Sequence, residues 1–325
     1  MNPDLLIKNF HDYTIVDVRS PFEYSKGHIP TSINIPLFSD EERKIIGTTY
    51  KQQGKKEAIE KGLGFVNLPK LIEQFKPIVG KPLVIYCARG GMRSYSVAWL
   101  LRLFDYDIQI LKGGYKSFRG WAILQFKKEY NLKVIGGFTG IGKTEIIKQL
   151  NNSIDLEDLA NHKGSVFGGF EKKQPTQEHF ENLLAFSLFS LDKDWIFVED
   201  ESRFIGTIYI PNDFYDQMKK CSVIVLQDIL DSRITKCVLQ YKKHKKEDLK
   251  NAIKKIEKKL GILAAKTACC FIDDENYSEA CRILFSYYDK GYSFSLSKRD
   301  PKSISYLEIT NKTNEQICAS LQNSN

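Results

Sequence analysis

Long apolar runs, cysteine and histidine are all scarce in this chain of 325 residues. No stretch approaches the roughly 18 consecutive apolar residues that cross a bilayer, and Asp4 and Lys8 interrupt the apolar residues near Met1, which argues against a signal peptide. Seven cysteines without a CxxC pair, and five histidines, are too few for a disulfide framework or a structural metal site. We therefore expect a cytoplasmic protein with reduced thiols and no membrane partner.

The composition is that of a folded protein with a basic excess. Charged residues make up 27% and aromatic residues 12%, which excludes disorder as the main state. The formal charge of +8 favours a polyanionic partner, although only weakly, because lysine is common along the whole chain. Between 241 and 259, nine lysines accompany three acids, while Leu249, Ile253, Ile256 and Leu260 share one helical face. This segment is either the solvated face of a packed helix or a surface for nucleic-acid phosphates.

Strands and helices alternate in two successive series. In the first third we expect buried strands at residues 13–19, 82–87 and 108–111, and a helix at 95–103. The pattern restarts near residue 132, with strands at 133–136, 195–199 and 222–226 and a helix at 145–150. Such alternation is typical of parallel sheets covered on both faces. The sequence therefore predicts two α/β domains, residues 1–125 and 126–325, and makes no prediction of the oligomeric state.

A cysteine loop, Cys87-Ala-Arg-Gly-Gly-Met-Arg93, joins the strand at 82–87 to the following helix. Its glycines allow successive N–H groups to point inward and form a cradle for an anion. These groups, together with Arg89 and Arg93, favour the thiolate of Cys87 over the thiol. The pattern predicts a nucleophilic cysteine that attacks an oxyanion or carries a chalcogen atom, with Cys87, Arg89 and Arg93 as the catalytic residues.

A phosphate-binding loop, Gly137-Phe-Thr-Gly-Ile-Gly-Lys-Thr144, matches GxxxxGK[ST] between a predicted strand and a predicted helix. The backbone around Gly137, Gly140 and Gly142 is expected to surround a diphosphate, with Lys143 reaching an outer phosphate and Thr144 binding Mg²⁺. The strand at 195–199 ends in Glu199 and Asp200, either of which could hold the magnesium through water, and Asp200 is taken as the second predicted magnesium ligand. The motif leaves open whether the ligand is ATP, GTP or another diphosphate.

The first third resembles the rhodanese family. The run from Asp17 to Pro30, Asn34-Ile-Pro36 and the cysteine loop together carry this resemblance. It implies that Asp17 and Arg19 brace the loop and that His28 holds a turn. Arg93 stands six positions after Cys87, as in cysteine-dependent phosphatases, whereas many sulfurtransferase loops are one residue shorter. A phosphatase therefore remains an alternative.

Three further runs resemble bacterial tRNA 2-selenouridine synthases: residues 159–168, 174–181 and 198–206. With the two loops they cover the chain from about 13 to 240. The resemblance implies a rhodanese-like parallel-sheet domain followed by a P-loop NTPase-like α/β domain with a helical, lysine-rich C-terminal region. It also adds His162, Lys163 and Arg203, with Glu199 and Asp200, as possible site residues of the second domain.

That resemblance implies an enzyme acting on the wobble 2-thiouridine of tRNAs for Lys, Glu and Gln. Its co-substrates are geranyl diphosphate, which alkylates the sulfur, and selenophosphate, whose selenium replaces the geranylthio group through a perselenide on Cys87. The alternative from the loops alone is a cysteine-dependent phosphatase or thiosulfate sulfurtransferase fused to a regulatory NTPase domain. A tRNA-binding or sensing module without catalysis is a third interpretation, which the intact Cys87, Arg89 and Arg93 disfavour.

Overall fold

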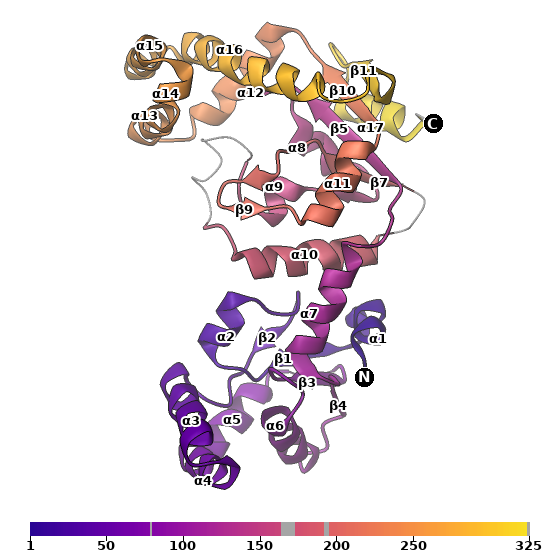
Figure 1. Ribbon diagram of the computed structural model, residues 1–325, viewed down its shortest axis with the longest axis vertical. Helices are drawn as coiled ribbons and strands as arrows, with labels where there is room; N and C mark the ends of the chain where they lie inside the picture. The colour runs from indigo at the N-terminus through magenta and orange to yellow at the C-terminus, as the bar shows by residue number, and fades with distance from the viewer. Residues whose placement is uncertain (79, 164–172, 192–194, 324–325) are drawn as a thin grey trace. The chain divides into compact units, whose positions relative to one another are not determined.

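The computed structural model describes residues 1–78, 80–163, 173–191 and 195–323 (Figure 1). The chain forms two compact units. Unit 1 comprises Met1–Phe126 with Thr176–Ser190, and unit 2 comprises Lys127–Pro175 with Leu191–Asn325. The chain first passes from unit 1 to unit 2 after Phe126, close to the predicted boundary at 125–126. The segment 176–190 was expected within the second domain, but its contacts group it with the first.

Unit 1 contains a parallel sheet in the order β2-β1-β3-β4. Its central strand β3 is apolar and buried along its whole length, which is typical of a strand covered on both faces. The predicted strands of the first third are confirmed. The strands are β1 Thr14–Asp17, β2 Ile33–Asn34, β3 Leu83–Tyr86 and β4 Ile108–Ile110. The helices are α1 Pro3–Lys8, η1 Phe10–Asp12, α2 Pro21–Lys26, α3 Asp40–Gln52, α4 Lys55–Phe65, α5 Leu68–Phe75, α6 Met92–Arg102, α7 Gly114–Gln125 and α10 Gln177–Ser190.

Helix α10 belongs to unit 1 because its apolar side chains pack against α1 and α7. Phe180 and Leu184 are fully buried, and the ring of Phe189 meets that of Trp121 edge-on at 5.3 Å between centroids. The opposite face of the sheet is covered by α5 and α6, whose Phe75 and Leu101 are also fully buried. The apolar periodicity of α10 alone does not show which sheet it covers.

Unit 2 contains a five-stranded parallel sheet in the order β11-β10-β5-β7-β6. The predicted strands at 133–136, 195–199 and 222–226 are confirmed, and with them the α/β fold class. The strands are β5 Leu132–Gly137, β6 Ser153–Ile154, β7 Ile196–Glu199, β10 Val223–Gln227 and β11 Ile304–Glu308, with an antiparallel pair β8 Phe204–Ile205 and β9 Ile208–Tyr209. The helices are α8 Lys143–Ile147, α9 Leu156–Leu159, α11 Asn212–Lys220, α12 Leu230–Tyr241, α13 Lys246–Lys255, α14 Glu257–Leu260, α15 Ile262–Asp273, α16 Tyr277–Leu296, η2 Pro301–Ser303 and α17 Asn314–Asn323.

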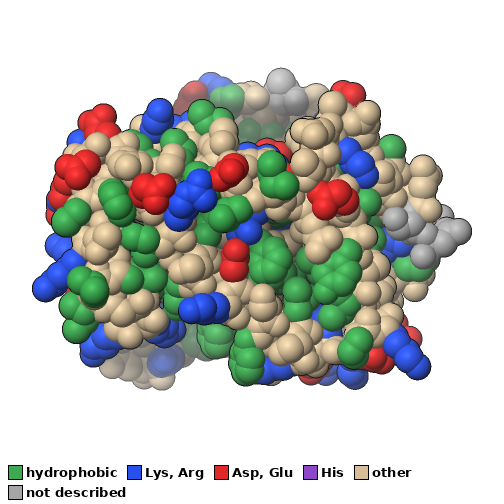
Figure 2. Space-filling model, turned by 90° about the horizontal axis from the view of Figure 1, so that it is seen from above, with side chains coloured by type: hydrophobic (Ala, Val, Ile, Leu, Met, Phe, Trp, Pro, Cys, Tyr) green, Lys and Arg blue, Asp and Glu red, His purple; other side chains and the backbone are tan. Residues whose placement is uncertain are grey.

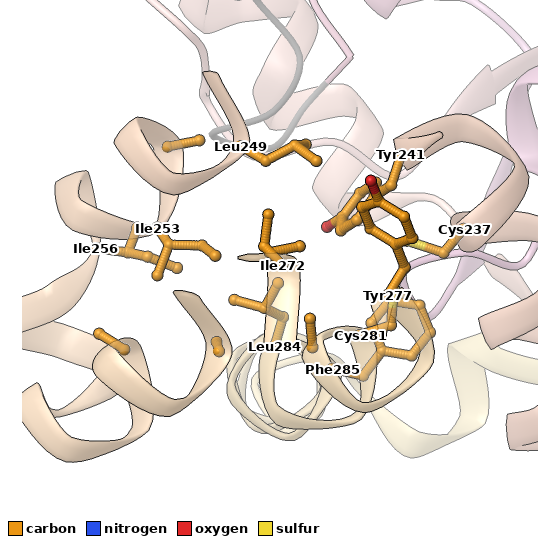
Figure 3. Packing of buried hydrophobic residues seen from close by; sticks show 14 of the residues in the cluster. Cys237, Tyr241, Leu249, Ile253, Ile256, Ile272, Tyr277, Cys281, Leu284 and Phe285 are labelled. Atoms are coloured by element: carbon orange, nitrogen blue, oxygen red, sulfur yellow. The ribbon is translucent and has the colours of Figure 1, made fainter. Parts of the chain in front are cut away.

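The lysine-rich segment lies in a group of helices, α12 to α16, with an apolar core of its own (Figure 3). Leu249, Ile253 and Ile256 are buried in this core, as the helical spacing predicted. The segment forms two helices, because the backbone leaves the helical conformation at Ile256. Lys246 pairs with Glu275, just beyond α15, at 2.8 Å, and Lys250 pairs with Asp273, the last residue of α15, at 2.9 Å. The segment thus forms two packed helices with a basic outer face, and contact of that face with nucleic-acid phosphates stays a prediction.

The surface of the protein carries both signs of charge. On the face seen in Figure 2, basic and acidic side chains are interspersed, with hydrophobic side chains between them. None of the helices in the described parts of the chain combines the length and apolarity needed to span a bilayer.

Candidate functional site

Cys87 lies where β3 ends, and its thiol is buried, with the residue 3% exposed. The N–H of Gly91 donates to Sγ at 3.3 Å, and the hydroxyl of Ser94 on α6 lies at the same distance. Burial opposes ionisation of the thiol, but hydrogen bonds from Ser94 and from the loop backbone outweigh it, so the pKa of Cys87 is lowered. The site therefore favours a thiolate, which is the nucleophilic form.

The backbone at the start of α7, just after a pair of glycines, binds the cysteine loop by hydrogen bonds. The N–H groups of Tyr115 and Lys116 donate to the carbonyls of Cys87 and Ala88, at 2.9 and 3.0 Å. Gly114 adopts a positive φ of 59°, and a Cβ there would lie 2.3 Å from the Cys87 carbonyl oxygen. Only glycine allows this approach of two backbones. This contact was not predicted from the sequence, although two consecutive glycines just after a predicted strand are a signal for such a close approach.

The two arginines of the loop have different surroundings. Arg89 is exposed, as expected for a side chain that meets a ligand from solution. Arg93 instead forms a bidentate ion pair with Glu23 on α2, with N–O distances of 2.6 and 3.1 Å. Burial opposes ionisation of Glu23, but the hydrogen bond from Arg93 outweighs it and lowers the pKa of that carboxyl. Arg93 is thus held by Glu23 in this structure, and its catalytic role stays a prediction.

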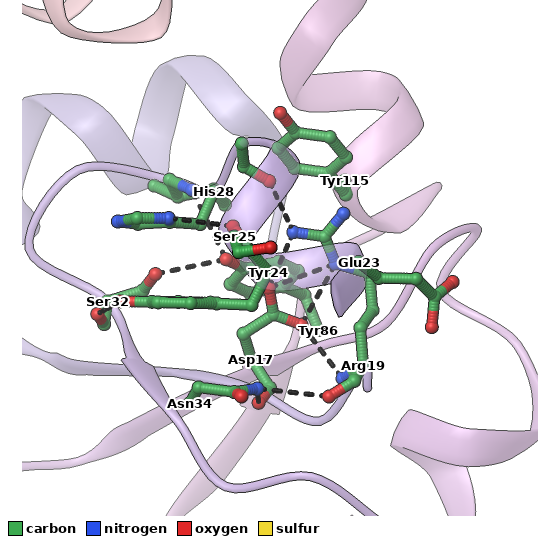
Figure 4. Close-up of polar contacts among 12 residues, drawn as sticks. Asp17, Arg19, Glu23, Tyr24, Ser25, His28, Ser32, Asn34, Tyr86 and Tyr115 are labelled. Atoms are coloured by element: carbon green, nitrogen blue, oxygen red, sulfur yellow. Dashed lines mark hydrogen bonds and ion pairs between the residues drawn. The ribbon is translucent and has the colours of Figure 1, made fainter. Parts of the chain in front are cut away.

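A buried polar network lies next to the loop (Figure 4). Asp17 and Arg19 form an ion pair at 2.6 Å, and the guanidinium lies 3.8 Å from the centre of the Tyr115 ring. Since the N–H of Tyr115 binds the Cys87 carbonyl, Arg19 supports the loop through Tyr115. His28 stacks on Tyr24, and its Nδ1–H donates a hydrogen bond to the Tyr24 carbonyl at 3.0 Å, which is a structural role at a turn.

The phosphate loop runs between β5 and α8, and cations hold its carbonyl groups. Lys143 Nζ donates to Gly137 O at 3.0 Å, Arg233 Nε to Thr139 O at 2.9 Å, and Lys236 Nζ to Ile141 O at 3.2 Å. Because these carbonyls are engaged, N–H groups of the loop and of the first turn of α8 are left to face an anion. Arg233 and Lys236 on α12 were not predicted from the sequence.

Glycine is required inside the phosphate loop at Gly140. Its φ is 79°, and an added Cβ would lie 2.8 Å from both the Arg233 carbonyl and the Phe285 ring. Gly137 and Gly142 also have positive φ, of 152° and 92°. Helices α12 and α16 therefore press directly against the loop and fix its shape.

Carboxylates gather beside Lys143 and Thr144. The Thr144 hydroxyl donates to Glu157 at 3.3 Å, and the N–H of Glu157 donates to Glu199 at 3.4 Å. Burial, followed by the nearby Glu201, raises the pKa of Glu157 to about 8. Burial, followed by Glu157, also raises the pKa of Glu199, whose Oε1 is buried without a hydrogen-bond partner among the described residues. Such repulsion between carboxylates would be relieved by a cation.

Asp200, the second predicted magnesium ligand, is engaged elsewhere. Its carboxylate pairs with Lys219 and Arg299, both at 2.8 Å, and accepts from the Tyr292 hydroxyl at 3.3 Å. Burial opposes ionisation, but Lys219 and Arg299 outweigh it and lower the pKa of Asp200. The carboxylate next to Thr144 is Glu157. Among the described residues, no group of three or more His, Cys, Asp or Glu side chains is arranged to hold a metal ion.

The phosphate loop opens into a cavity of about 1320 Å³ within unit 2. Its lining includes nine lysines and four acids, so the cavity is basic. Lys163 belongs to this lining. His162 and Arg203 do not belong to it: the N–H of His162 binds the Glu157 carbonyl, and Arg203 donates to the side chain of Asn212. Residues 164–168 of the predicted 159–168 signature lie outside the described residues.

Comparison with known family models divides the chain once, between residues 120 and 130, and places residues 176–190 with the second match. The model of the tRNA 2-selenouridine synthase AAA domain matches residues 130–324, and that of the rhodanese-like domain matches residues 2–120. The chain belongs to the tRNA 2-selenouridine synthase family. It is 35% identical to the tRNA 2-selenouridine synthase of Sulfurovum sp. (strain NBC37-1), over 87% of this chain and 89% of that protein.

Other family members show similar identity. The protein of that name from Hydrogenovibrio crunogenus is 33% identical over 92% of both chains, and that from Nitrosomonas eutropha is 39% identical over 69% of this chain and 61% of its own length. Among solved structures, the N-terminal domain of a putative ATP/GTP binding protein from Clostridium difficile 630 is 43% identical over 34% of this chain and 88% of that chain, with a TM-score of 0.33.

Within this synthase-family chain, the structure adds residues that the sequence motifs did not indicate. Ser94 contacts Cys87 Sγ, Glu157 contacts Thr144, and Arg233, Lys236 and Tyr292 hold the phosphate loop. Only Ser94 lies inside a recognised motif, one residue after Arg93. The others lie 13 or more residues from the loop, and only folding brings them to it.

Proposed function

We propose that this protein modifies tRNA, converting wobble 2-thiouridine to 2-selenouridine in two steps that use its two loops. The observation that carries the proposal is the presence, in one chain of this family, of a buried cysteine with a lowered pKa and a phosphate loop in a basic cavity. The expected tRNAs are those for Lys, Glu and Gln, and the expected compartment is the cytoplasm. A cavity lined by lysines suits a polyanion, because each neutralised phosphate releases counterions.

The first step is alkylation of sulfur. The sulfur of 2-thiouridine attacks C1 of geranyl diphosphate, a C–S bond forms, the C–O bond breaks, and diphosphate leaves while N3 of the base loses its proton. Lys143 and the loop N–H groups would neutralise the charge that builds up on diphosphate, which lowers the barrier. Alkylation turns a thiocarbonyl sulfur, which is a poor leaving group, into a thiolate that can leave C2.

Magnesium fits this site on its donor chemistry. Mg²⁺ usually takes one or two protein ligands together with phosphate oxygens and water. The Thr144 hydroxyl and Glu157 carboxylate are adjacent, and the unpartnered oxygen of Glu199 lies in the same buried cluster. When bound, the ion would supply positive charge to the departing diphosphate. Glu157 replaces Asp200 as the proposed carboxylate ligand, because the carboxylate of Asp200 forms ion pairs with Lys219 and Arg299.

The second step replaces sulfur by selenium at the Cys87 loop. The C2–S bond breaks, a C2–Se bond forms, and geranylthiol and phosphate are released from the alkylated base, selenophosphate and water. This net reaction is redox-neutral, because selenium in selenophosphate is already at the level of selenide. The perselenide expected from the family resemblance lies two electrons above selenide and would need an oxidant for loading and a thiol for release. The proposed step therefore does not pass through it, and the mass of the Cys87 peptide after incubation with selenophosphate checks this.

Mass spectrometry of tRNA nucleosides tests the function. Full-length protein is incubated with 2-thiouridine tRNA and geranyl diphosphate, selenophosphate, both or neither. We expect S-geranyl-2-thiouridine with geranyl diphosphate alone and 2-selenouridine only with both. No nucleoside change in any arm would refute the proposal. Rapid Cys87-dependent hydrolysis of p-nitrophenyl phosphate without tRNA would instead support the phosphatase alternative.

A further inference from the structure

A second cavity lies in unit 1, beside the cysteine loop and separate in its chemistry from the phosphate loop. Its volume is about 570 Å³, and it is lined by α3, α4, α5, the loops beside them and one face of α6. Figure 1 shows these four helices gathered in one part of unit 1. We propose that this groove holds the isoprenoid chain of the S-alkylated base while selenium replaces its sulfur, an inference that rests on the function proposed above.

The first support is the exposure of large apolar side chains along the groove. Soluble proteins rarely expose a contiguous apolar patch without using it. Here Leu63 is 70% exposed and Trp99 is 65% exposed, and both line the groove. The other large apolar side chains of the lining that are at least 47% exposed are Tyr50, Leu68, Met92 and Tyr95.

The second support is the position of the groove relative to the reactive sulfur. Helix α6 begins at Met92, directly after Gly91, whose N–H donates to Cys87 Sγ. Ser94 on the same helix contacts Sγ, whereas Met92, Tyr95 and Trp99 line the groove. From Met92 to Trp99 the helix rises by about 10 Å, at roughly 1.5 Å per residue. An alkyl chain attached to a base held at Cys87 would therefore extend along an apolar surface on the same helix.

The third support is charge. The charged residues of the lining are all basic, Arg43, Lys55 and Arg93, but both arginines pair with Glu23 outside the lining, so the rim keeps a reduced positive charge. An apolar floor with a basic rim is complementary to a hydrocarbon chain attached to an anionic RNA backbone. Selenophosphate and thiosulfate are small inorganic anions and need no apolar groove, so exchange of a chalcogen atom alone leaves this cavity unexplained. The groove would also select the alkylated base over 2-thiouridine, because only the alkylated base buries apolar surface there.

A chain-length series tests the inference. Anticodon stem-loop RNAs carry 2-thiouridine with an S-methyl, S-dimethylallyl or S-geranyl group, and their affinity for the full-length protein is measured by fluorescence anisotropy. We expect affinity to rise at least about tenfold from methyl to geranyl, which burial of two methylene groups already gives. Leu63→Glu should abolish this rise. Leu103→Glu is the matched control, because Leu103 is 63% exposed in the same unit but does not line the groove.

Trp99→Ala is a second groove variant that adds no charge, and it should reduce the dependence on chain length. If the rise persists in both groove variants, the chain binds elsewhere and the inference is wrong, even if the wild type makes 2-selenouridine. If the wild type makes no 2-selenouridine from S-geranyl RNA and selenophosphate, the proposed function fails instead. Sedimentation equilibrium tests whether a second copy of the chain occupies the groove instead. A dimer that Leu63→Glu dissociates, together with an affinity that does not depend on chain length, would show that the groove is an interface between copies and would overturn the inference.

Discussion

Gly114 is the residue at which the cysteine loop is most sensitive to a single added carbon. A Cβ at this position would lie 2.3 Å from the Cys87 carbonyl oxygen and 2.3 Å from the Gly90 nitrogen, both of which are backbone atoms. Gly114→Ala must therefore separate the loop from α7 and break the two hydrogen bonds from Tyr115 and Lys116. The left-handed backbone costs about 1–2 kcal/mol for alanine, and each hydrogen bond contributes about 0.5–1.5 kcal/mol.

We therefore expect Gly114→Ala to lower the free energy of unfolding of unit 1 by about 2–5 kcal/mol. Gly120 lies in the same helix, is exposed, and has no atom within 4 Å of an added Cβ. Gly120→Ala should raise stability by about 0.5–1 kcal/mol, since alanine is the better helix former. Alkylation of Cys87 should slow in the Gly114 variant only, because the Gly91 N–H moves away from the sulfur.

Fluorescence-detected urea unfolding measures both effects. Trp121 is buried in α7, and it becomes the single reporter when Trp99 and Trp195 are replaced by phenylalanine. This probe follows unit 1 within the full chain. A Gly114→Ala variant within about 0.5 kcal/mol of its parent, which is the range of neutral surface changes, would refute the close backbone packing described here. Equal losses at Gly114 and Gly120 would also contradict it.

Three further predictions concern single polar groups. Ser94→Ala should raise the pKa of Cys87, because the hydrogen bond from the hydroxyl is one of the contacts that lower it; the pH dependence of alkylation at the Cys87 peptide measures this, and an unchanged profile would contradict the role of the hydroxyl. Tyr292→Phe removes the hydroxyl that accepts from the Gly137 N–H at 3.0 Å and should speed exchange of that amide about fivefold or more, which amide hydrogen exchange measures. His179 lies 4.0 Å from another histidine ring, and burial, followed by that ring, lowers its pKa to about 4. Because its folded-state pKa is depressed, stability of unit 1 should fall as the pH drops from about 6.5 towards 4; His179→Phe should flatten this decline in thermal unfolding curves.

The local features of the site could be predicted from the sequence. Each loop is a contiguous sequence motif. The spacing of its glycines and the apolar strand before it are enough to predict a phosphate loop or a cysteine loop. The apolar face of the 241–259 segment was also visible, because helical periodicity marks the buried side. The break at Ile256 was not visible, since it depends on how α13 and α14 each meet α15.

The partners of charged groups could not be predicted, because they come from distant parts of the chain. Arg93 pairs with Glu23, which lies 70 residues earlier, and Asp200 pairs with Arg299, which lies 99 residues later. From the sequence alone, every acid that follows an apolar strand is an equally good candidate for a magnesium ligand. Only the packed structure shows that Asp200 is neutralised by two cations while Glu157 lies at the hydroxyl of Thr144.

The division of chemistry between the two loops is tested most directly by nucleoside mass spectrometry on two variants supplied with geranyl diphosphate and selenophosphate together. Cys87→Ser should lose 2-selenouridine and accumulate S-geranyl-2-thiouridine, because the phosphate loop is intact. Lys143→Ala should lose both products from 2-thiouridine tRNA, yet should still convert tRNA that is geranylated beforehand. Loss of geranylation in Cys87→Ser, or loss of selenation of the pre-geranylated tRNA in Lys143→Ala, would contradict the account.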